Sequence, residues 1–551
     1  MNQYLQCDKS ERMPETPHPS TKPDTKPEPA SLSALAPLKI AVFRMLWCTW
    51  LMANVSMWMS DVAAAWMMTS LTSSPIWVAL VQTASTLPVF LLGLPSGALA
   101  DILDRRRYFI VTQFWLAAVA VLLCVVVSID GMSPLLLLVL MFANGIGLAM
   151  RWPVFAAIVP ELVPRPQLPA ALALNGLAMN ASRIVGPLIA GAMIASAGSA
   201  YVFVFNAVLS VLSGFIIMRW RHVHVPSALG RERLLSAMRV GVQFVRQSAR
   251  VKPVLLRIAI FFFYSTALLA LLPLVAKGLH RGDAATFTLL LAAMGAGAVA
   301  AVMALPRLRQ SASHDTLVLG GTLLQSATMV VVAYSSQVSV TALAMFLSGM
   351  GWIATVNSLS VSMQLALPDW VRARGMSIYQ MSVMGAGALG AAVWGQVATL
   401  YTVGTSLVIA AVSGIFLMLL VHRLVKAPGI EEDLTPSREL KAPVAATPPV
   451  TGRVQVCIEY WIDPARADDF LVVMQESRRS RLRQGALAWE LLHDIAEPGR
   501  YIEQIVEESW TEHLRRFDRV TSADVALRER KLAFHVREAA PLITRYVLKQ
   551  V

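Results

Sequence analysis

Twelve long apolar segments restrict the fold of this chain more than any other feature of its sequence. They lie between residues 41 and 426, short stretches of turn residues separate them, and each approaches the roughly 20 residues that span a hydrocarbon core. Because no water is present there to bond the peptide groups, such segments must be helices. The sequence therefore predicts an all-α polytopic membrane protein with twelve transmembrane helices. The expected spans are 42–70, 76–96, 108–129, 134–158, 170–197, 200–219, 254–277, 284–305, 315–334, 338–364, 376–400 and 404–424.

The distribution of Lys and Arg predicts the orientation of these helices. The loops on one side hold seventeen such residues, whereas the loops on the other side hold only Lys277 and Arg281. Positive residues are retained on the cytoplasmic side of a membrane, so both termini are expected in the cytoplasm. The whole net charge of +13 lies within residues 41–450, which favours a membrane surface over nucleic acid as its partner.

Changes in composition and the long middle loop divide the chain into six parts. The central loop contains a stretch with apolar and basic residues on different helical faces, which favours an interfacial helix on anionic headgroups over a regulatory partner site. The expected parts are a proline-rich, disordered cytoplasmic tail (1–37), an N-terminal six-helix half (38–219), the cytoplasmic central loop (220–253), a C-terminal six-helix half (254–426), a proline-rich linker (427–450) and a small cytoplasmic domain (451–551).

The small domain alternates strand and helix patterns in the order β-α-β-β-α-β, which predicts a ferredoxin-like α+β fold. The expected strands are 453–462, 486–495, 501–509 and 542–548, the first helix is 464–484, and the second helix opens at Ser509 with Glu512 completing a capping box. The histidines of this domain lack a metal-binding spacing, and the four cysteines of the chain are scattered. No metal or cofactor is therefore expected.

Residues 97–107 form the strongest local motif, GALADILDRRR, between the second and third predicted helices. The motif resembles the signature loop of the major facilitator superfamily, although Ile102 and Asp104 stand where Arg and Gly are usual. The resemblance implies a secondary transporter whose two halves latch together on the cytoplasmic side. Topology anchoring alone is the alternative role for the arginines. The gate residues implied by this loop are Gly97, Asp101, Asp104, Arg105 and Arg106.

Further stretches resemble one branch of that superfamily, the transmembrane secretion effectors, which includes the enterobactin exporter. They are VAAAW at 62–66, PELVPR at 160–165 and the run ALN…NASRIVGP within 173–187. Residues 459–464 and 508–514 resemble the small domain of some members, which is similar to antibiotic-biosynthesis monooxygenase domains. The resemblance implies a multi-pass protein of a bacterial inner membrane. It also implies a homodimer through residues 451–551, because related small domains dimerise through their sheets.

The fifth predicted helix contains Gly186 and Pro187 in a run that is similar to an element of superfamily antiporters. Proline removes a backbone donor and small residues permit close helix contact, so this segment could bend and seal a pathway. Ordinary small-residue packing is the alternative. No phosphate-binding loop with the GxxxxGK[ST] pattern occurs in the sequence, so the energy is expected to come from an ion gradient.

Ionisable groups inside the predicted helices are candidates for coupling, because charge is costly in hydrocarbon. Arg183 lies near the middle of the fifth helix and should need an anion, for which Asp61 is the candidate partner and proton carrier. Asp61 could instead be an interfacial aspartate, and Arg151 is a second possible partner for it. The polar residues that could line the pathway, or simply bond between helices, are Asn54, Asn175 and Asn180.

These observations favour a proton-antiport exporter of small amphipathic organic molecules, siderophore-like or drug-like. Its expected partners are the small-molecule substrate, protons and the lipid bilayer, with no role for nucleic acid. Proton-coupled uptake would use the same fold. A membrane-anchored enzyme acting through residues 451–551 is disfavoured, because a single helix would suffice to anchor it.

Overall fold

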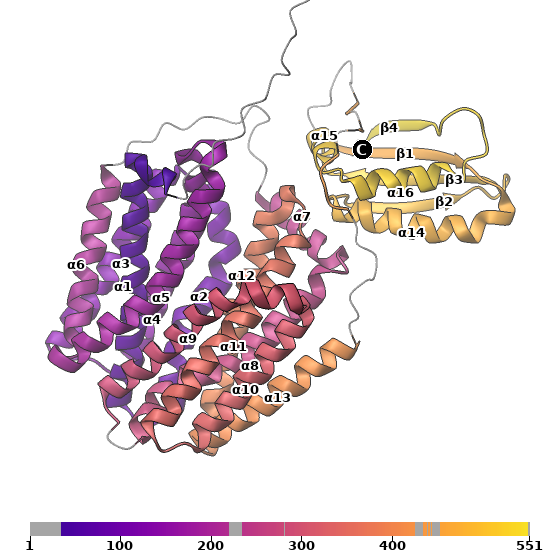
Figure 1. Ribbon diagram of the computed structural model, residues 1–551. Coiled ribbons are helices and arrows are strands. Elements are labelled where there is room, and N and C mark those ends of the chain that lie inside the picture. Colours follow the sequence, from indigo (N-terminus) through magenta and orange to yellow (C-terminus); the bar gives the residue numbers. More distant parts are fainter. Residues whose placement is uncertain are drawn as a thin grey trace, which may run out of the picture.

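The computed structural model describes residues 35–219, 234–279, 282–424, 433–437, 439–440, 442–443 and 452–548. Long helices form two groups, and a small α+β unit lies at one end of them (Figure 1). We refer to helices α1–α6 as the N-terminal bundle, to α8–α13 as the C-terminal bundle, and to residues 452–548 as the C-terminal unit.

The long helices begin and end within a few residues of most of the predicted segments. The N-terminal bundle contains α1 (Ala41–Leu71), α2 (Pro75–Ile102), α3 (Arg105–Ser128), α4 (Pro134–Leu162), α5 (Leu168–Ala197) and α6 (Ser199–Met218), with short 3₁₀ turns at Ala36–Lys39 and Arg165–Gln167. The C-terminal bundle contains α8 (Val251–Gly278), α9 (Ala284–Ser311), α10 (His314–Tyr334), α11 (Val338–Leu365), α12 (Asp369–Leu400) and α13 (Val403–Leu424).

Eleven helices in the described part of the chain are long and apolar enough to cross a membrane. The exception among the predicted segments is α1, which has 31 residues but includes Asp61, Asn54 and several serines and tryptophans that lower its mean hydropathy. Length and composition therefore support eleven of the twelve expected spans.

Local sequence explains where several helices start. Pro75 and Pro134 occupy first-turn positions, where the missing N–H of proline costs nothing. The side chains of Ser133, Ser313 and Asp283 accept hydrogen bonds from the first-turn amides of α4, α10 and α9.

The two bundles meet mainly along two helix pairs, α2 with α12 and α5 with α9, and α8 also contacts α1 and α2. Two hydrogen bonds link the first pair: Ile76 donates its backbone N–H to Thr399 Oγ1 at 3.0 Å, and Thr83 Oγ1 donates to the carbonyl of Ala388 at 2.9 Å. Along the α5–α9 pair, Gly191 packs so tightly that a Cβ there would overlap Thr288. Close helix contact therefore defines the space left between the bundles.

The C-terminal unit is an antiparallel sheet covered by helices on one face. Its strands are β1 (Arg453–Trp461), β2 (Ala488–His493), β3 (Arg500–Glu507) and β4 (Ile543–Leu548), in the spatial order β2-β3-β1-β4. Its helices are α14 (Ala467–Arg483), α15 (Trp510–Asp518) and α16 (Ser522–Leu532), with a 3₁₀ turn at Pro464–Arg466. Phe470 and Met474 of α14 pack on the alternate residues Val454, Val456 and Ile458 of β1.

The four predicted strands are present in one antiparallel sheet, and the helices between them differ from the prediction at one place. The expected second helix consists of two, because α15 ends at Asp518 and Thr521 starts α16 with a capping box to Asp524. Half of the predicted capping box at Ser509 is present, since Ser509 Oγ accepts a hydrogen bond from Glu512 N at 3.2 Å. The Glu512 carboxylate does not complete the box, because it accepts hydrogen bonds from Arg515 Nη1 at 2.6 Å and Arg519 Nη2 at 2.8 Å.

A carboxylate is completely buried beneath the helices of this unit. Glu503 of β3 accepts hydrogen bonds from Ser477 Oγ at 2.7 Å, Trp489 Nε1 at 2.9 Å and Lys531 Nζ at 3.2 Å. Burial raises the pKa of Glu503, but the charges of Lys531 and Arg481 and the hydrogen bonds outweigh burial and lower its pKa to about 2. The ionised, fully bonded carboxylate therefore stabilises the unit.

The pH dependence of folding tests this network. The pKa of Glu503 is below its ordinary value of 4.5, so its stabilising contribution is present above pH 4.5 and is lost as the pH falls towards about 2. Glu503→Gln should remove this dependence and destabilise the unit at pH 7 by about 3 kcal/mol or more, because Lys531 loses its counter-charge. Hydrogen exchange of residues 452–548 in the full-length protein measures both effects.

The matched control is Glu490→Gln, which changes an exposed carboxylate on β2 of the same sheet. The control should keep the acid-dependent loss of protection. Equal acid sensitivity of Glu503→Gln and the unaltered protein would contradict the role of this carboxylate.

Helix α7 (Leu234–Gln247) packs against the C-terminal bundle with one face. Phe244 is buried there and meets the ring of Trp370, at the start of α12, edge to face with ring centroids 5.7 Å apart. The apolar side of the amphipathic helix is therefore covered by protein, and not by lipid alone.

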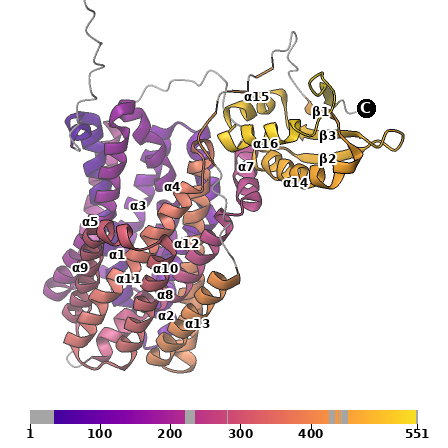
Figure 2. The same cartoon turned by 45° about the vertical axis from the view of Figure 1, so that its right-hand side comes forward.

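The other face of α7 contacts the C-terminal unit, which lies beside it in both views (Figures 1 and 2). Arg239 Nη2 lies 2.7 Å from Glu508 Oε2, and Gln243 Nε2 donates to the carbonyl of Ala486 at 2.7 Å. We expected the basic side of this helix on headgroups, but Arg239 instead pairs with an acidic residue about 270 positions away. The loop sequence alone could not reveal such a partner.

Charge reversal tests the docking of the unit on α7. Arg239→Glu should lower the hydrogen-exchange protection of α7 by roughly threefold to tenfold, because it replaces a half-buried ion pair worth about 1 kcal/mol or less with repulsion. Combining it with Glu508→Arg should restore most of the protection.

Arg530→Glu is the control, because Arg530 pairs with Glu476 inside the C-terminal unit. This variant should leave α7 exchange unchanged. The interface would be refuted if Arg239→Glu and Arg530→Glu gave the same exchange as the unaltered protein.

Candidate functional site

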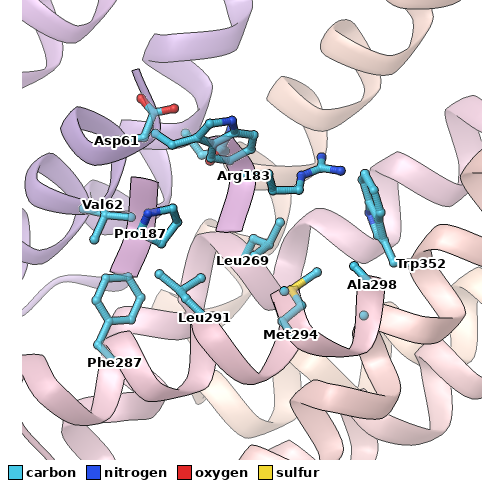
Figure 3. Close-up of a pocket in the computed structure, with 15 residues that line it drawn as sticks. Asp61, Val62, Arg183, Pro187, Leu269, Phe287, Leu291, Met294, Ala298 and Trp352 are labelled. Atoms are coloured by element: carbon cyan, nitrogen blue, oxygen red, sulfur yellow. The ribbon is translucent and has the colours of Figure 1, made fainter. Parts of the chain in front are cut away.

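A cavity of about 100 Å³ lies between the two bundles (Figure 3). Its walls come from α1, α2 and α5 on one side and from α8, α9 and α11 on the other. The lining residues are Trp58, Asp61, Val62, Ala65, Gln82, Arg183, Pro187, Leu269, Phe287, Leu291, Met294, Gly295, Ala298, Gly349 and Trp352. The site is therefore mostly apolar, with one acid and one cation.

Two features of α5 shape the wall of this cavity. A Cβ at Gly186 would lie 2.6 Å from Trp58 Cβ, so only glycine lets α1 approach this closely. Pro187 has no N–H to donate to the carbonyl of Arg183 one turn earlier, which weakens the helix at this position. The predicted Gly-Pro element thus lies at the cavity. Its glycine allows α5 to pack closely against α1 within the N-terminal bundle.

Arg183 extends into the cavity between two tryptophans. Its guanidinium carbon lies 3.9 Å from the ring centroid of Trp352 and 5.3 Å from that of Trp58. Trp352 belongs to α11, so the stack connects the two bundles. Cation–π contact of this kind partly compensates a desolvated cation. Sequence reasoning missed both tryptophans, because an isolated Trp in an apolar helix has no distinguishing pattern.

Asp61 also lines the cavity but does not pair with Arg183. Its Oδ1 accepts a hydrogen bond from Ser85 Oγ of α2 at 3.2 Å. In Figure 3 the guanidinium of Arg183 points towards Trp352, away from the carboxylate. In the described part of the chain Arg183 forms no ion pair, so the expected Asp61–Arg183 pair is not present in this conformation.

The structure places Arg151 outside the cavity. This residue of α4 is buried, its Nη1 donates to the carbonyl of Ala53 at 3.5 Å, and its guanidinium carbon lies 5.3 Å from the ring of Trp50. No contact in the described part of the chain joins Arg151 to Asp61.

Asn54 and Asn175 are not among the described lining residues of the cavity. Asn54 donates through Nδ2 to the carbonyl of Trp50 at 2.7 Å, and the Oδ1 of Asn175 is buried without a partner in the described structure. The side chain of Asn180 lies outside the described residues. Hydrogen bonding within α1 is thus the role seen for Asn54.

The predicted gate loop has local roles where its side chains are described. Asp104 caps α3 by accepting from Arg107 N at 3.1 Å, and Arg106 Nη2 donates to the carbonyl of Met218 at the end of α6 at 2.6 Å. Both contacts lie within the N-terminal bundle. The side chains at Gly97, Asp101 and Arg105 lie outside the described residues, so the expected latch between the bundles stays a prediction.

At the end opposite α7, a contact between the bundles covers the cavity. Lys277 Nζ donates to the carbonyl of Thr69 at 2.6 Å and lies 5.6 Å from the ring centroid of Trp66. Trp66 in turn stacks on Phe287, a cavity-lining residue, with ring centroids 5.7 Å apart. We call Lys277, Thr69, Trp66 and Phe287 the distal closure.

A cavity between two helical bundles, lined by apolar walls and a few polar groups, is the arrangement of a membrane transporter of the major facilitator type. Within this class the chain belongs to the transmembrane secretion effector family, whose model matches residues 32–550. The match includes the C-terminal unit.

Curated relatives are transporters. The chain is 21% identical to the Staphyloferrin A transporter of Staphylococcus aureus (strain NCTC 8325 / PS 47) over 332 residues, which cover 59% of this chain and 81% of the relative. It is 23% identical to Macrolide efflux protein A of Streptococcus pyogenes over 44% of this chain and 60% of that protein.

Solved structures support the fold alone, since the sequence identities are low. A POT family transporter in complex with 5-aminolevulinic acid has a TM-score of 0.57 at 13% identity, covering 69% of this chain and 95% of that chain. An inward-facing, unoccupied bacterial homologue of the human lysosomal transporter Spinster has a TM-score of 0.55 at 13% identity, covering 70% and 95%.

Removing the distal closure should open the cavity at that end. Lys277→Met deletes a charged donor, whose hydrogen bond contributes about 1.5–3 kcal/mol, so a cysteine placed at Ala65 should be labelled about tenfold faster or more. The measurement uses an impermeant maleimide added on the side of the membrane opposite α7, in a protein whose native cysteines are replaced.

Lys252→Met provides the control, because Lys252 is exposed at the other end of the same helix, α8. Its labelling rate should equal that of the parent protein. An unchanged rate in Lys277→Met would show that the contact does not restrict access.

Proposed function

We propose that this protein is a proton-antiport exporter of small amphipathic organic molecules. The observation that carries the proposal is the cavity between the bundles, which combines apolar walls with one carboxyl group, Asp61, and one guanidinium, Arg183. Membership of a secretion effector family and similarity to a siderophore transporter and a macrolide efflux protein support export.

In this proposal all twelve predicted segments cross a bacterial inner membrane as two halves of six helices, with α1 as the twelfth span. The excess of Lys and Arg in the loops at the α7 end supports a cytoplasmic location for that end and for the C-terminal unit. The distal closure then seals the cavity on the outside, and its opening releases the substrate.

Asp61 is the proposed proton carrier, because it is the one carboxyl group among the described lining residues of the cavity. Its hydrogen bond to Ser85 leaves the second carboxylate oxygen available for a proton. An ionisable group at this depth is costly in hydrocarbon, which a role in coupling explains.

Proton-driven transport tests this role. Asp61→Asn has nearly the same shape but cannot ionise, so it should abolish substrate accumulation in everted vesicles driven by an imposed pH gradient, while equilibrium binding persists. A macrolide and staphyloferrin A are the first substrates to measure.

The control variant is Asp130→Asn, which changes a loop aspartate with a positive φ of 53° that asparagine tolerates. It should transport normally. Proton-driven accumulation by Asp61→Asn at the level of Asp130→Asn would exclude Asp61 as the carrier.

The C-terminal unit is proposed to form a homodimer through the face of its sheet that carries no helix. Ile502 and Val506 of β3 lie on this face beside Trp461 of β1, together with the exposed Tyr546 and Leu548 of β4. These five residues are separate from the contacts with α7. Docking and dimerisation could therefore occur together, with a structural or binding role for the unit.

A further inference from the structure

We propose that the cavity selects organic anions, with a planar oxyanion such as a carboxylate bound by Arg183 and an apolar, ring-containing body against the facing wall. This inference rests on the proposed function in taking the cavity as the substrate site. It goes further by naming the charge and shape of the substrate.

Arg183 has no counter-charge in the described part of the chain. Its contacts are the rings of Trp58 and Trp352, and Asp61 is bonded to Ser85 instead. The side chain of Arg183 is only partly buried and faces the cavity. A cation held in an apolar, partly hydrated cavity attracts an anion strongly, because the low local dielectric constant reduces the Coulomb attraction less than bulk water does.

The stack of Arg183 on Trp352 leaves the edge of the guanidinium accessible. A guanidinium donates its five N–H groups in its own plane, and a ring against its face leaves these donors uncovered. Trp352, 3.9 Å away, covers one face of Arg183 and restricts its rotation. The edge of the guanidinium is therefore free to bind a carboxylate with two parallel hydrogen bonds, which a point-like cation such as lysine could not do.

The wall around Arg183 is mostly apolar. Leu269, Leu291, Met294 and Phe287 of the C-terminal bundle line the same cavity as Arg183 (Figure 3). Flat aromatic bodies pack well on such surfaces, and the flexible Met294 can adapt to different ones. The described lining offers few hydrogen-bonding side chains besides Arg183, Asp61 and Gln82, which favours a ligand with one charged head over a polyhydroxylated one.

The position of Arg183 also links recognition to both bundles. Arg183 is on α5 of the N-terminal bundle, and Trp352 is on α11 of the C-terminal bundle. An anion at the guanidinium edge therefore binds a side chain of one bundle whose orientation depends on a ring of the other. Arg183 is thus a specificity-determining residue, and Trp352 a positioning residue that acts through it.

Equilibrium binding without any pH gradient tests the proposal. The probes are benzoate, 2-naphthoate and anthracene-2-carboxylate, each paired with its neutral amide, and 2-naphthylmethylammonium as a cation of similar size. Calorimetry on the full-length protein in nanodiscs should show at least one carboxylate binding tenfold or more tightly than its amide and than the cation. Arg183→Gln should reduce this ratio to about one, and Arg183→Lys should keep only part of it.

Arg151→Gln is the matched control, because Arg151, like Arg183, lies beside a tryptophan of the N-terminal bundle but is not among the described lining residues of the cavity. It should keep the full carboxylate preference. Trp352→Leu should lower the preference severalfold, whereas Trp352→Phe, which retains a ring over the guanidinium, should restore most of it.

Two results would overturn the inference: equal affinity of every carboxylate and its amide in the unaltered protein, or a full carboxylate preference in Arg183→Gln. Thermal unfolding of each variant confirms that it is folded. Because no gradient is present, loss of proton-driven transport with an intact carboxylate preference contradicts only the proposed coupling. Conversely, gradient-driven transport of macrolides without any carboxylate preference contradicts only the present inference.

Discussion

The close approach of α5 to α1 and α9 is the contact on which the cavity depends. Gly186 allows α1 to lie against α5, and Gly191 allows α9 to do so on the other side. In a membrane, burying apolar surface away from lipid gives helices little free energy of association. Tight van der Waals packing at small residues therefore decides which helices are in contact. Arg183, one turn before Gly186, is thereby held between tryptophans from both bundles.

The protein treats two charged sites, Glu503 and Arg183, in opposite ways. In the C-terminal unit, Glu503 is enclosed and has Lys531, Ser477 and Trp489 as partners, so its charge is neutralised within the fold. In the cavity, Arg183 contacts aromatic rings and forms no ion pair with any described residue. A satisfied buried network stabilises a structure, whereas a cation with free donors beside a cavity is suited to bind a ligand.

Predictions that depend on local sequence were the most successful. Helix positions followed from apolar length, the cap at Ser509 from its side chain, and the order of the small unit from the alternation of its strands. Predictions of contacts between side chains on different helices were less successful. Asp61 and Arg183 line one cavity without pairing, and Arg151 lies elsewhere. Lys277 contributed to the predicted topology only as a rare positive residue on the outer side, although it bonds to Thr69 in the distal closure.

The sequence by itself determined that this chain is a polytopic helical membrane protein with a basic face and a small α+β unit, because hydropathy, helix capping and strand alternation act over neighbouring residues. Only the tertiary structure decided that Trp352 stacks on Arg183, that α7 lies between a helical bundle and the C-terminal unit, and that Asp61 bonds to Ser85. These contacts join residues of different structural elements, and Arg239 and Glu508 of the α7 interface are 269 positions apart. Their geometry depends on how the helices cross, which no local pattern encodes.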